Sequence, residues 1–270
     1  GVGVRDGRPV HGHHRVVDEQ KELAAVSRSE HACHMLAWPS RTLDIRWNQH
    51  VLVGAIGAGG TGPGGHILFS RCAFYRNEAE LWGGAIAIDD SDIGISVDSS
   101  VFVANYAGEV GGALFKRSEI PFFGPVGSHI VCNSTIVRNM AGVAGGGVAL
   151  DTALDPIQIQ QSILWENSDA TNGTGEGAQV HVASIGIPMS VEWSCVQGLT
   201  SLTGTGNISQ DPMFIRLPSD GGDGWNVGDN NDDFGDLRLR PDSPAINAGD
   251  PDAKELLSTD LEGHARVLCG

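Results

Sequence analysis

Five consecutive segments of the chain fit one sequence template, and this internal repeat limits the possible folds more than any other feature. Each segment is aligned on the residue ten positions before a recurring asparagine. The segments begin at Ile67, Ile95, His129, Ile157 and Met189, so successive starts are 28, 34, 28 and 32 residues apart. A repeat of this length predicts units that cannot bury an apolar face alone and therefore stack on their neighbours.

Four template positions keep one type of side chain along the repeat. Two of them are apolar: Phe69, Val97, Val131, Ile159 and Val191, and then Phe74, Phe102, Ile136, Leu164 and Val196. A small residue lies between them: Cys72, Ser100, Ser134, Ser162 and Ser194. The last position holds Asn77, Asn105, Asn139 and Asn167, with Leu199 in the fifth copy. We expect the apolar positions to fill a core and the asparagines to form a hydrogen-bonded ladder at a tight bend.

The repeat predicts two or three short strands in each unit. Each unit opens with alternating apolar and polar residues, as over residues 157–164, which is typical of a strand. A Gly-Gly pair follows the asparagine by six residues in the first three copies, and a second short strand comes next; in the fourth copy an insertion at 171–177 delays that strand. The sequence therefore predicts an all-β protein. We expect a right-handed parallel β-helix of at least five coils over residues 66–210, with stacked residues about 4.8 Å apart.

The two ends depart from this template. We interpret residues 1–65 as a non-repeat segment with a glycine-rich connector at 57–65 and a helix over 18–38, which Asp18 caps. Such a helix would cover the open end of the stack, and disorder or sequence foreign to the domain is the alternative. Residues 211–270 are rich in Pro, Gly and Asp and are interpreted as the turn-rich end of the β-helix.

Charge and composition exclude several classes of partner. The net charge is −16, and residues 51–270 hold 10 Lys and Arg against 27 Asp and Glu. This acidity argues against nucleic acid and anionic lipid as partners, and it suits cation binding and solubility outside the cell. No run of 18 apolar residues is present, so we expect no transmembrane helix. The five cysteines are interpreted as small buried hydrophobes, with one disulfide left open.

Two parts of the sequence resemble known families. The units Phe74-Tyr-Arg-Asn77 and Gly83-Gly-Ala-Ile86, which recur in the second copy, resemble the FxxN and GGAI pair of polymorphic outer membrane protein repeats. The tail pieces Asp211-Pro-Met-Phe214 and Ser243-Pro-Ala-Ile-Asn-Ala-Gly249 are similar to those of secreted β-helix proteins of the pectin-lyase-like superfamily, especially planctomycete-type surface proteins.

This resemblance covers roughly residues 66–270 and implies a secreted or surface-displayed bacterial β-helix. In such proteins the tail continues to an anchor or sorting module, so we expect the chain to be truncated at Gly270. The superfamily includes lyases, hydrolases and non-catalytic adhesins, so the resemblance implies a fold more strongly than an activity.

One charged column is the candidate for catalysis. Asp89, Arg117 and Asp151 each lie twelve residues after the asparagine of their unit, so we expect them to line up on adjacent coils. Two carboxylates about 5–5.5 Å apart suit retaining glycoside hydrolysis, and about 6.5–9.5 Å suits inverting hydrolysis. The favoured interpretation is a surface charge ladder in which the arginine separates like charges.

Two further groups are candidates for ligand binding. Asp229, Asn231 and Asp233 have the spacing of a hard-cation loop, but Phe234 stands where an EF-hand needs glycine, so a structural Ca²⁺ and a solvated turn stay open. Trp165 and Trp193 lie on neighbouring coils, where they either contact a glycan or pack beneath a loop.

The sequence thus favours a non-catalytic stalk or adhesin-like module, secreted or on the outer cell surface, that binds a polysaccharide or another cell-surface ligand. It acts as a monomer or as part of a longer chain. The alternative is a polysaccharide lyase or glycoside hydrolase of the pectin-lyase-like superfamily.

Overall fold

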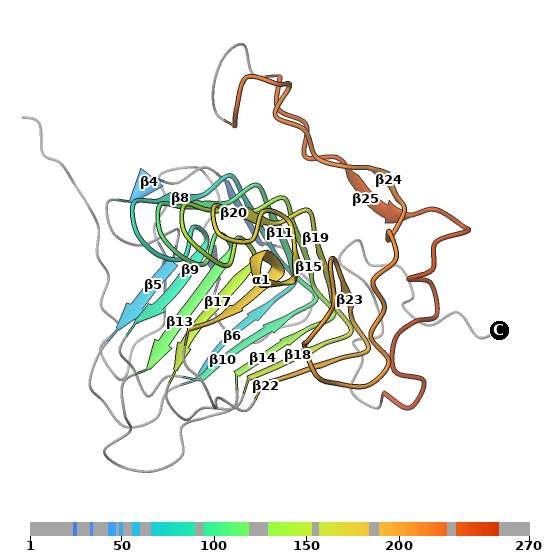
Figure 1. The fold of residues 1–270 in the computed structure, drawn as a ribbon. Coiled ribbons are helices and arrows are strands. Elements are labelled where there is room, and N and C mark those ends of the chain that lie inside the picture. The colour runs from blue at the N-terminus through green and yellow to red at the C-terminus, as the bar shows by residue number, and fades with distance from the viewer. Residues whose placement is uncertain are drawn as a thin grey trace, which may run out of the picture.

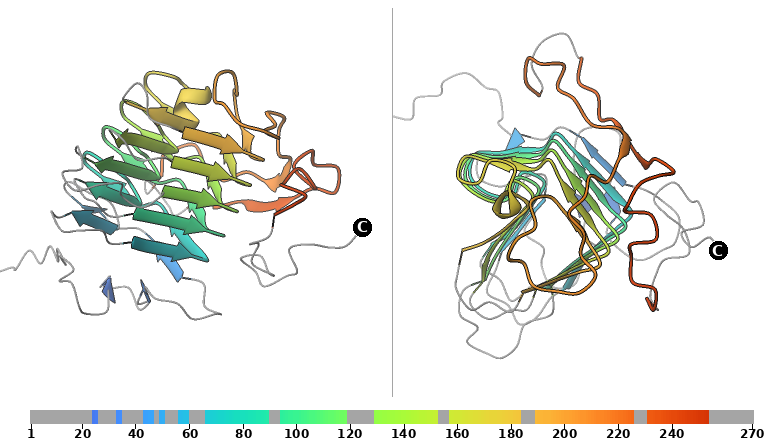
Figure 2. Two further views of the ribbon diagram at one scale, coloured as in Figure 1. Left: turned by 90° about the horizontal axis from the view of Figure 1, so that it is seen from below. Right: turned by 45° about the vertical axis from the view of Figure 1, so that its right-hand side comes forward.

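The protein forms a parallel β-solenoid, seen here in a computed structural model (Figure 1). The structure describes residues 66–89, 94–118, 129–152, 157–183, 189–225 and 231–253, together with the short strand segments 24–25, 33–34, 43–46, 49–50 and 56–59. Four parallel sheets, numbered here in the order in which each coil passes through them, enclose one core. Two views of the stack show successive coils lying one on another (Figure 2).

The strands of each sheet come from successive coils. Sheet 1 contains β6 (His66–Ser70), β10 (Gly94–Asp98), β14 (His129–Cys132), β18 (Ile157–Gln160) and β22 (Met189–Glu192). Sheet 2 contains β3 (Leu43–Arg46), β7 (Cys72–Tyr75), β11 (Val101–Val103), β15 (Thr135–Val137), β19 (Ile163–Trp165) and β23 (Cys195–Val196). Sheet 3 contains β4 (Gln49–His50), β8 (Glu78–Ala79), β12 (Tyr106–Ala107), β16 (Met140–Ala141) and β20 (Ser168–Asp169). Sheet 4 contains β5 (Ile56–Gly59), β9 (Ile86–Asp89), β13 (Leu114–Ser118), β17 (Val148–Thr152) and β21 (Val180–Val182).

The predicted register is confirmed. Phe102 pairs with Phe74 on one side and with Ile136 on the other. The Phe74 and Phe102 rings stack with their centroids 4.6 Å apart, and both side chains are fully buried. Counted from sheet 1 to sheet 4, the described strands from β6 to β21 form four complete coils, which is fewer than the predicted five or more. The strands β3 to β5 before them and β22 and β23 after them add an incomplete coil at each end.

The asparagines form the predicted ladder. The Oδ1 atom of Asn105 accepts hydrogen bonds from the backbone N–H of Asn77 at 2.9 Å and from its Nδ2 at 2.8 Å, and Asn139 and Asn167 repeat the pattern. In the fourth coil the Oε1 of Gln179 takes over, accepting from Asn167 Nδ2 at 2.8 Å. Gln179 therefore ends the ladder where the fifth copy has a leucine.

The small column forms a second ladder, which the sequence did not predict. Each serine hydroxyl accepts a hydrogen bond from a backbone N–H one coil earlier, as Ser134 does from Ser100 N–H at 3.1 Å. The same hydroxyl donates to the carbonyl oxygen two residues before it, which for Ser134 is that of Cys132 at 2.7 Å. Serine is therefore selected here for its hydrogen bonds as well as for its size.

Each coil has four strands where we predicted two or three, because its corners adopt left-handed backbone conformations. Three columns of corner residues have φ between +49° and +72°: Arg71, Ser99, Asn133, Gln161 and Trp193; Arg76, Ala104, Arg138 and Glu166; and Gly83, Gly111 and Gly145. Only the third column requires glycine, since a Cβ on Gly83 would lie 2.2 Å from the carbonyl oxygen of Ile86. The first column divides each long predicted strand in two.

The solenoid begins earlier than the predicted residue 66. β3, β4 and β5 pair in parallel with β7, β8 and β9, so the segment we interpreted as non-repeat already supplies strands to the stack. The predicted helix over residues 18–38 is wrong where this span is described, because β1 (Ala24–Ala25) and β2 (Cys33–His34) form an antiparallel pair. The apolar stripe of that helix was narrow, and most helical stability in proteins comes from packing such a face.

The chain covers the last coil with its own following residues. The backbone N–H groups of Val191 and Trp193 in and after β22 donate to the carbonyl oxygens of Thr203 and Thr205 at 3.1 and 2.8 Å. Leu199 and Leu202 pack on the core below. The short helix α1 (Glu176–Gln179) lies in the 171–177 insertion and its flank, and no helix in the described part of the chain is long enough to cross a membrane.

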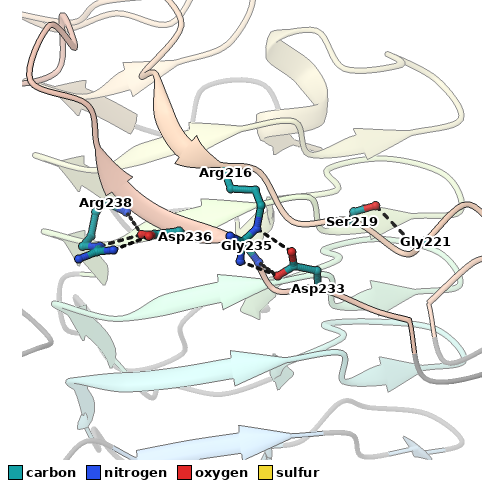
Figure 3. Close-up of polar contacts among 7 residues, drawn as sticks. All are labelled: Arg216, Ser219, Gly221, Asp233, Gly235, Asp236 and Arg238. Carbon is teal, nitrogen blue, oxygen red and sulfur yellow. Dashed lines mark hydrogen bonds and ion pairs between the residues drawn. The ribbon is translucent and has the colours of Figure 1, made fainter.

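Beyond this cap, residues 211–225 and 231–239 form an arm that does not continue the solenoid. The arm contains the antiparallel strands β24 (Phe214–Arg216) and β25 (Asp236–Leu239), which lie across several coils (Figure 3). Its apolar side chains cover the outer face of sheet 2, where Val103 and Val137 are fully buried. Near the first coils Asp232 pairs with Arg76 at 2.7 Å, and the ring of Phe234 lies 4.7 Å from that of Tyr75. The predicted turn-rich end is thus a cover for the side of the stack.

Candidate functional site

A groove of about 110 Å³ lies on the outer face of sheet 4 and contains two of the three predicted catalytic residues. Arg117 in β13 and Asp151 in β17 are adjacent partners in the parallel register. Both side chains line the groove and are partly exposed. The structure thus brings these two together as the repeat predicted.

Asp89 belongs to the same sheet in β9, one strand before β13. Its side chain lies outside the described residues, so the predicted carboxylate pair is placed only by its backbone. Two strand spacings separate β9 from β17, which is about 9–10 Å.

An aromatic wall closes one end of the groove. The rings of Trp82 and Phe115 stack with their centroids 5.6 Å apart, and the Arg117 guanidinium carbon lies 4.7 Å from the centroid of the Trp82 ring. The Trp82 indole N–H donates to a Glu109 carboxylate oxygen at 3.0 Å, which fixes the ring from the side. Cation–π contact and stacking together hold Arg117 over a flat apolar surface.

Ala149 opens the middle of the groove, and His181 lines the side opposite Phe115. Ala149 in β17 pairs in register with Phe115 on one side and with His181 in β21 on the other. Because alanine stands between two larger side chains, a hollow forms at that coil. Asp151 and Arg117 lie at its rim and His181 lines it, so an aromatic face meets a carboxylate, a guanidinium and an imidazole.

Sequence reasoning missed Trp82 and His181 as parts of this site. Trp82 occupies a position where the next coils have Val110 and Ala144, so no shared residue type marks it. His181 follows the insertion that delays the second strand of the fourth unit, which hid its register with Ala149. Only the pairing of strands shows that both residues belong to one groove.

Of the two tryptophans predicted to contact a glycan, Trp165 is buried and Trp193 is partly buried. Trp165 is 8% exposed and packs in the apolar cluster beneath the arm. Trp193 lies at a corner with φ +51°, and a Cβ on Gly206 would lie 2.2 Å from its ring. The packing alternative therefore describes Trp165.

The predicted cation loop is partly described, and an ion pair occupies its described carboxylate. Asp233 accepts hydrogen bonds from the Arg216 guanidinium at 2.6 and 3.1 Å and from the Gly235 N–H at 2.8 Å (Figure 3). The bond from Arg216 is the largest cause of the lowered pKa of Asp233. The Asn231 side chain lies against Gly221, and Asp229 is outside the described residues. Among the residues that are described, no three His, Cys, Asp or Glu side chains gather as metal ligands do.

The arm has a second pair of this kind. Arg238 donates to both carboxylate oxygens of Asp236, and this bond is the largest cause that lowers the pKa of Asp236 to about 2 (Figure 3). Asp233 and Asp236 are thus both engaged by arginine.

Two groups near the capped end of the solenoid, Glu176 and Cys195, have shifted pKa values. Burial raises the pKa of Glu176, but hydrogen bonds from the Ser201 hydroxyl and from the N–H groups of Thr200, Ser201 and Leu202 outweigh it, and the pKa is lowered. Burial, with the nearby charge of Asp211, raises the pKa of the Cys195 thiol to about 12. Glu176 therefore ties the 171–177 insertion to the cap, and Cys195 behaves as a core residue.

No family model, curated protein or solved structure matches the chain.

Proposed function

We propose that the protein is a secreted or surface-displayed β-solenoid module that binds a carbohydrate in the sheet 4 groove without cleaving it. One observation carries the proposal: the partly exposed Trp82 ring, backed by the buried Phe115, lies directly beside Arg117, Asp151 and His181. Sugar rings pack their apolar faces on aromatic side chains, and charged polar groups bind their hydroxyls. The groove is small, so it takes part of one sugar residue of a longer chain.

The stacked coils that carry the groove residues suit a binding module. The described coils from β6 to β21 are joined by stacked asparagine and serine hydrogen bonds, so the groove residues stand on strands that are tied to their neighbours. Binding groups held on a rigid scaffold lose little conformational entropy when a ligand binds. The FxxN and GGAI resemblance adds to the proposal, since that family supplies surface-displayed modules, and we propose this chain as a member.

A polysaccharide-cleaving enzyme is the second candidate, and one placement favours it. β9 and β17 carry Asp89 and Asp151 two strands apart, so the backbone separation of about 9–10 Å is near the range that inverting glycosidases need between carboxyl groups. Arg117 lies between the two aspartates in this column. A positive charge at that position suits a ladder of alternating charges better than a pair of carboxylates that share a catalytic water.

One panel of experiments separates the two candidates. Neutral and acidic polysaccharides are titrated against the protein with and without Ca²⁺, and the same mixtures are assayed for new reducing ends and unsaturated products. We expect saturable binding without cleavage. Arg117→Gln should weaken binding about tenfold or more, because a hydrogen bond from a charged group is worth about 1.5–3 kcal/mol.

Gln158→Ala, on the outer face of sheet 1, is the matched control and should leave binding unchanged. Binding that survives both Arg117→Gln and Trp82→Ala would contradict the proposed groove. Cleavage that is lost in Asp151→Asn would establish the enzyme instead.

A further inference from the structure

A second pocket, of about 170 Å³, lies at the corner between sheets 2 and 3, away from the sheet 4 groove. The coil contributes Arg76, Ala104 and Arg138 from one corner column, and Tyr106 and Met140 from β12 and β16. Trp225 of the arm forms the remaining wall. The pocket therefore exists only where the arm returns along the solenoid.

A break in the corner column creates this pocket. Arg76, Ala104, Arg138 and Glu166 hold equivalent positions on four successive coils, all with φ between +54° and +57° except Arg138 at +52°. Three of the four side chains are long and charged. The methyl group of Ala104 leaves a slot one coil wide between two arginines, because adjacent coils are about 4.8 Å apart.

The two arginines differ in how firmly they are held. Arg76 pairs at 2.7 Å with Asp232, whose side chain is only 2% exposed, so this pair belongs to the structure of the arm. Arg138 approaches Glu166 only to 3.5 Å, and both side chains are about one-third exposed. Ion pairs of this open kind contribute little, so another carboxylate can replace Glu166 at small cost.

Beside Tyr106 and Met140, the pocket is lined by the buried Asn77 and Asn105 and by one acid. Tyr106 and Met140 are adjacent in register and are 36% and 41% exposed. Glu78 lines the pocket in β8, on the coil of Arg76 and two coils from Arg138. Glu78 repels an anion at that end, so an anionic group is directed to Arg138 and an apolar ring to the slot over Ala104.

We propose that this corner pocket binds a small ring-bearing monocarboxylate, with its carboxylate on Arg138 and its ring between Tyr106, Met140 and Trp225. The ligand is small because the pocket is, and it carries a single charge because a protein of net charge −16 repels polyanions. A ligand of this size supports a dissociation constant on the order of 1 mM.

The probes are benzoate and its uncharged counterpart benzamide. Their binding to the whole chain is measured by saturation-transfer NMR and by titration. Glucuronate and glucose form a second charged and uncharged pair, which shows whether the ring is aromatic or a sugar. We expect each carboxylate to bind better than its neutral partner. Arg138→Gln should weaken benzoate binding about tenfold or more. Ala104→Glu should abolish it, because the new side chain fills the slot with its own carboxylate.

These substitutions suit the left-handed corner, since Gln161 and Glu166 adopt similar φ values of +49° and +55°. Arg71→Gln, at the other corner of the first coil with φ +56°, is the matched control and should bind benzoate as the parent chain does. Circular dichroism and Tm check that each variant folds. If Ala104→Glu does not fold, the result for Arg138→Gln decides the outcome. The proposal is overturned if neither carboxylate binds, if benzamide binds as well as benzoate, or if Arg138→Gln leaves benzoate binding unchanged.

Discussion

Replacing Asn139 by alanine tests the ladder that fixes one coil to the next. Asn139 Oδ1 accepts hydrogen bonds from the N–H of Asn105 at 2.9 Å and from its Nδ2 at 2.8 Å. Its own Nδ2 donates to Asn167 Oδ1 at 2.9 Å and to the Phe102 carbonyl oxygen at 3.0 Å. All these groups are buried, and alanine replaces none of the bonds.

The expected loss of stability follows from the groups that are left without a partner. The Asn105 N–H loses its acceptor, and at least one acceptor of the Asn139 amide loses its donor. Each such buried group costs about 1–3 kcal/mol, so the free energy of unfolding should fall by about 2–6 kcal/mol. That is a large fraction of the roughly 5–15 kcal/mol typical of a whole domain.

Chemical denaturation of both chains measures the difference, and hydrogen exchange of the Asn105 amide locates it. Gln158→Ala is the control, because Gln158 lies on the outer face of β18. It should change the free energy of unfolding by less than about 0.5 kcal/mol. A loss below about 1 kcal/mol for Asn139→Ala, with the Asn105 amide still protected, would refute the reasoning that the ladder satisfies these buried groups.

Three further predictions concern the arm, the cap and the buried thiol. Val137→Asp places a charge on the outer face of sheet 2, where Val137 is fully buried, so the arm should detach. Limited proteolysis within residues 211–239 should then be faster than in the parent chain. An unchanged cleavage rate would contradict the packing of the arm. The pKa of Glu176 is lowered from its usual 4.5, so its stabilising effect is complete above pH 4.5 and is lost as the pH falls through the lowered value. Glu176→Gln should therefore flatten the dependence of Tm on pH in that acidic range, and an identical pH profile in both chains would argue against the cap contact. The Cys195 thiol, with its pKa raised to about 12, should resist iodoacetamide at pH 8 in the folded protein and react after unfolding, as mass spectrometry of its peptide can show; equal rates in both states would contradict its burial.

The register of the repeats was predictable because the stacked columns repeat their residue types. Phe102 and Ile136 lie in one column because each side chain fills the same core, and Asn105 recurs because only an amide both accepts and donates at that bend. Arg117 and Asp151 follow from the same count, since they lie a fixed distance after their asparagines.

The strands that were missed before residue 66 left a signal in the sequence. Gly54-Ala55-Ile56 repeats Gly84-Ala85-Ile86, and β5 pairs Ile56 with Ile86. This match is only three residues long, and few positions of a coil are constrained, so it did not stand out in the sequence.

Other features could not be read from a periodic pattern. The left-handed corners hold residues as different as Arg71, Ser99 and Trp193, so the backbone there is imposed by stacking and not by residue preference. The arm has no repeat, and its partners on sheet 2 are distant in sequence, as Phe234 is from Tyr75. Trp82 reaches the groove from a position whose counterparts are Val110 and Ala144.

Contacts between equivalent residues of neighbouring coils are the most direct test of the solenoid. Nuclear Overhauser effects from the Phe102 ring, in protein labelled at phenylalanine rings and isoleucine methyl groups, report which side chains touch it. The stacked rings of Phe74 and Phe102, 4.6 Å apart, and the pairing of Phe102 with Ile136 predict strong signals to both neighbours at once. Signals to only one of them, or to neither, would contradict the stacking from which the groove, the ladders and the pocket all follow.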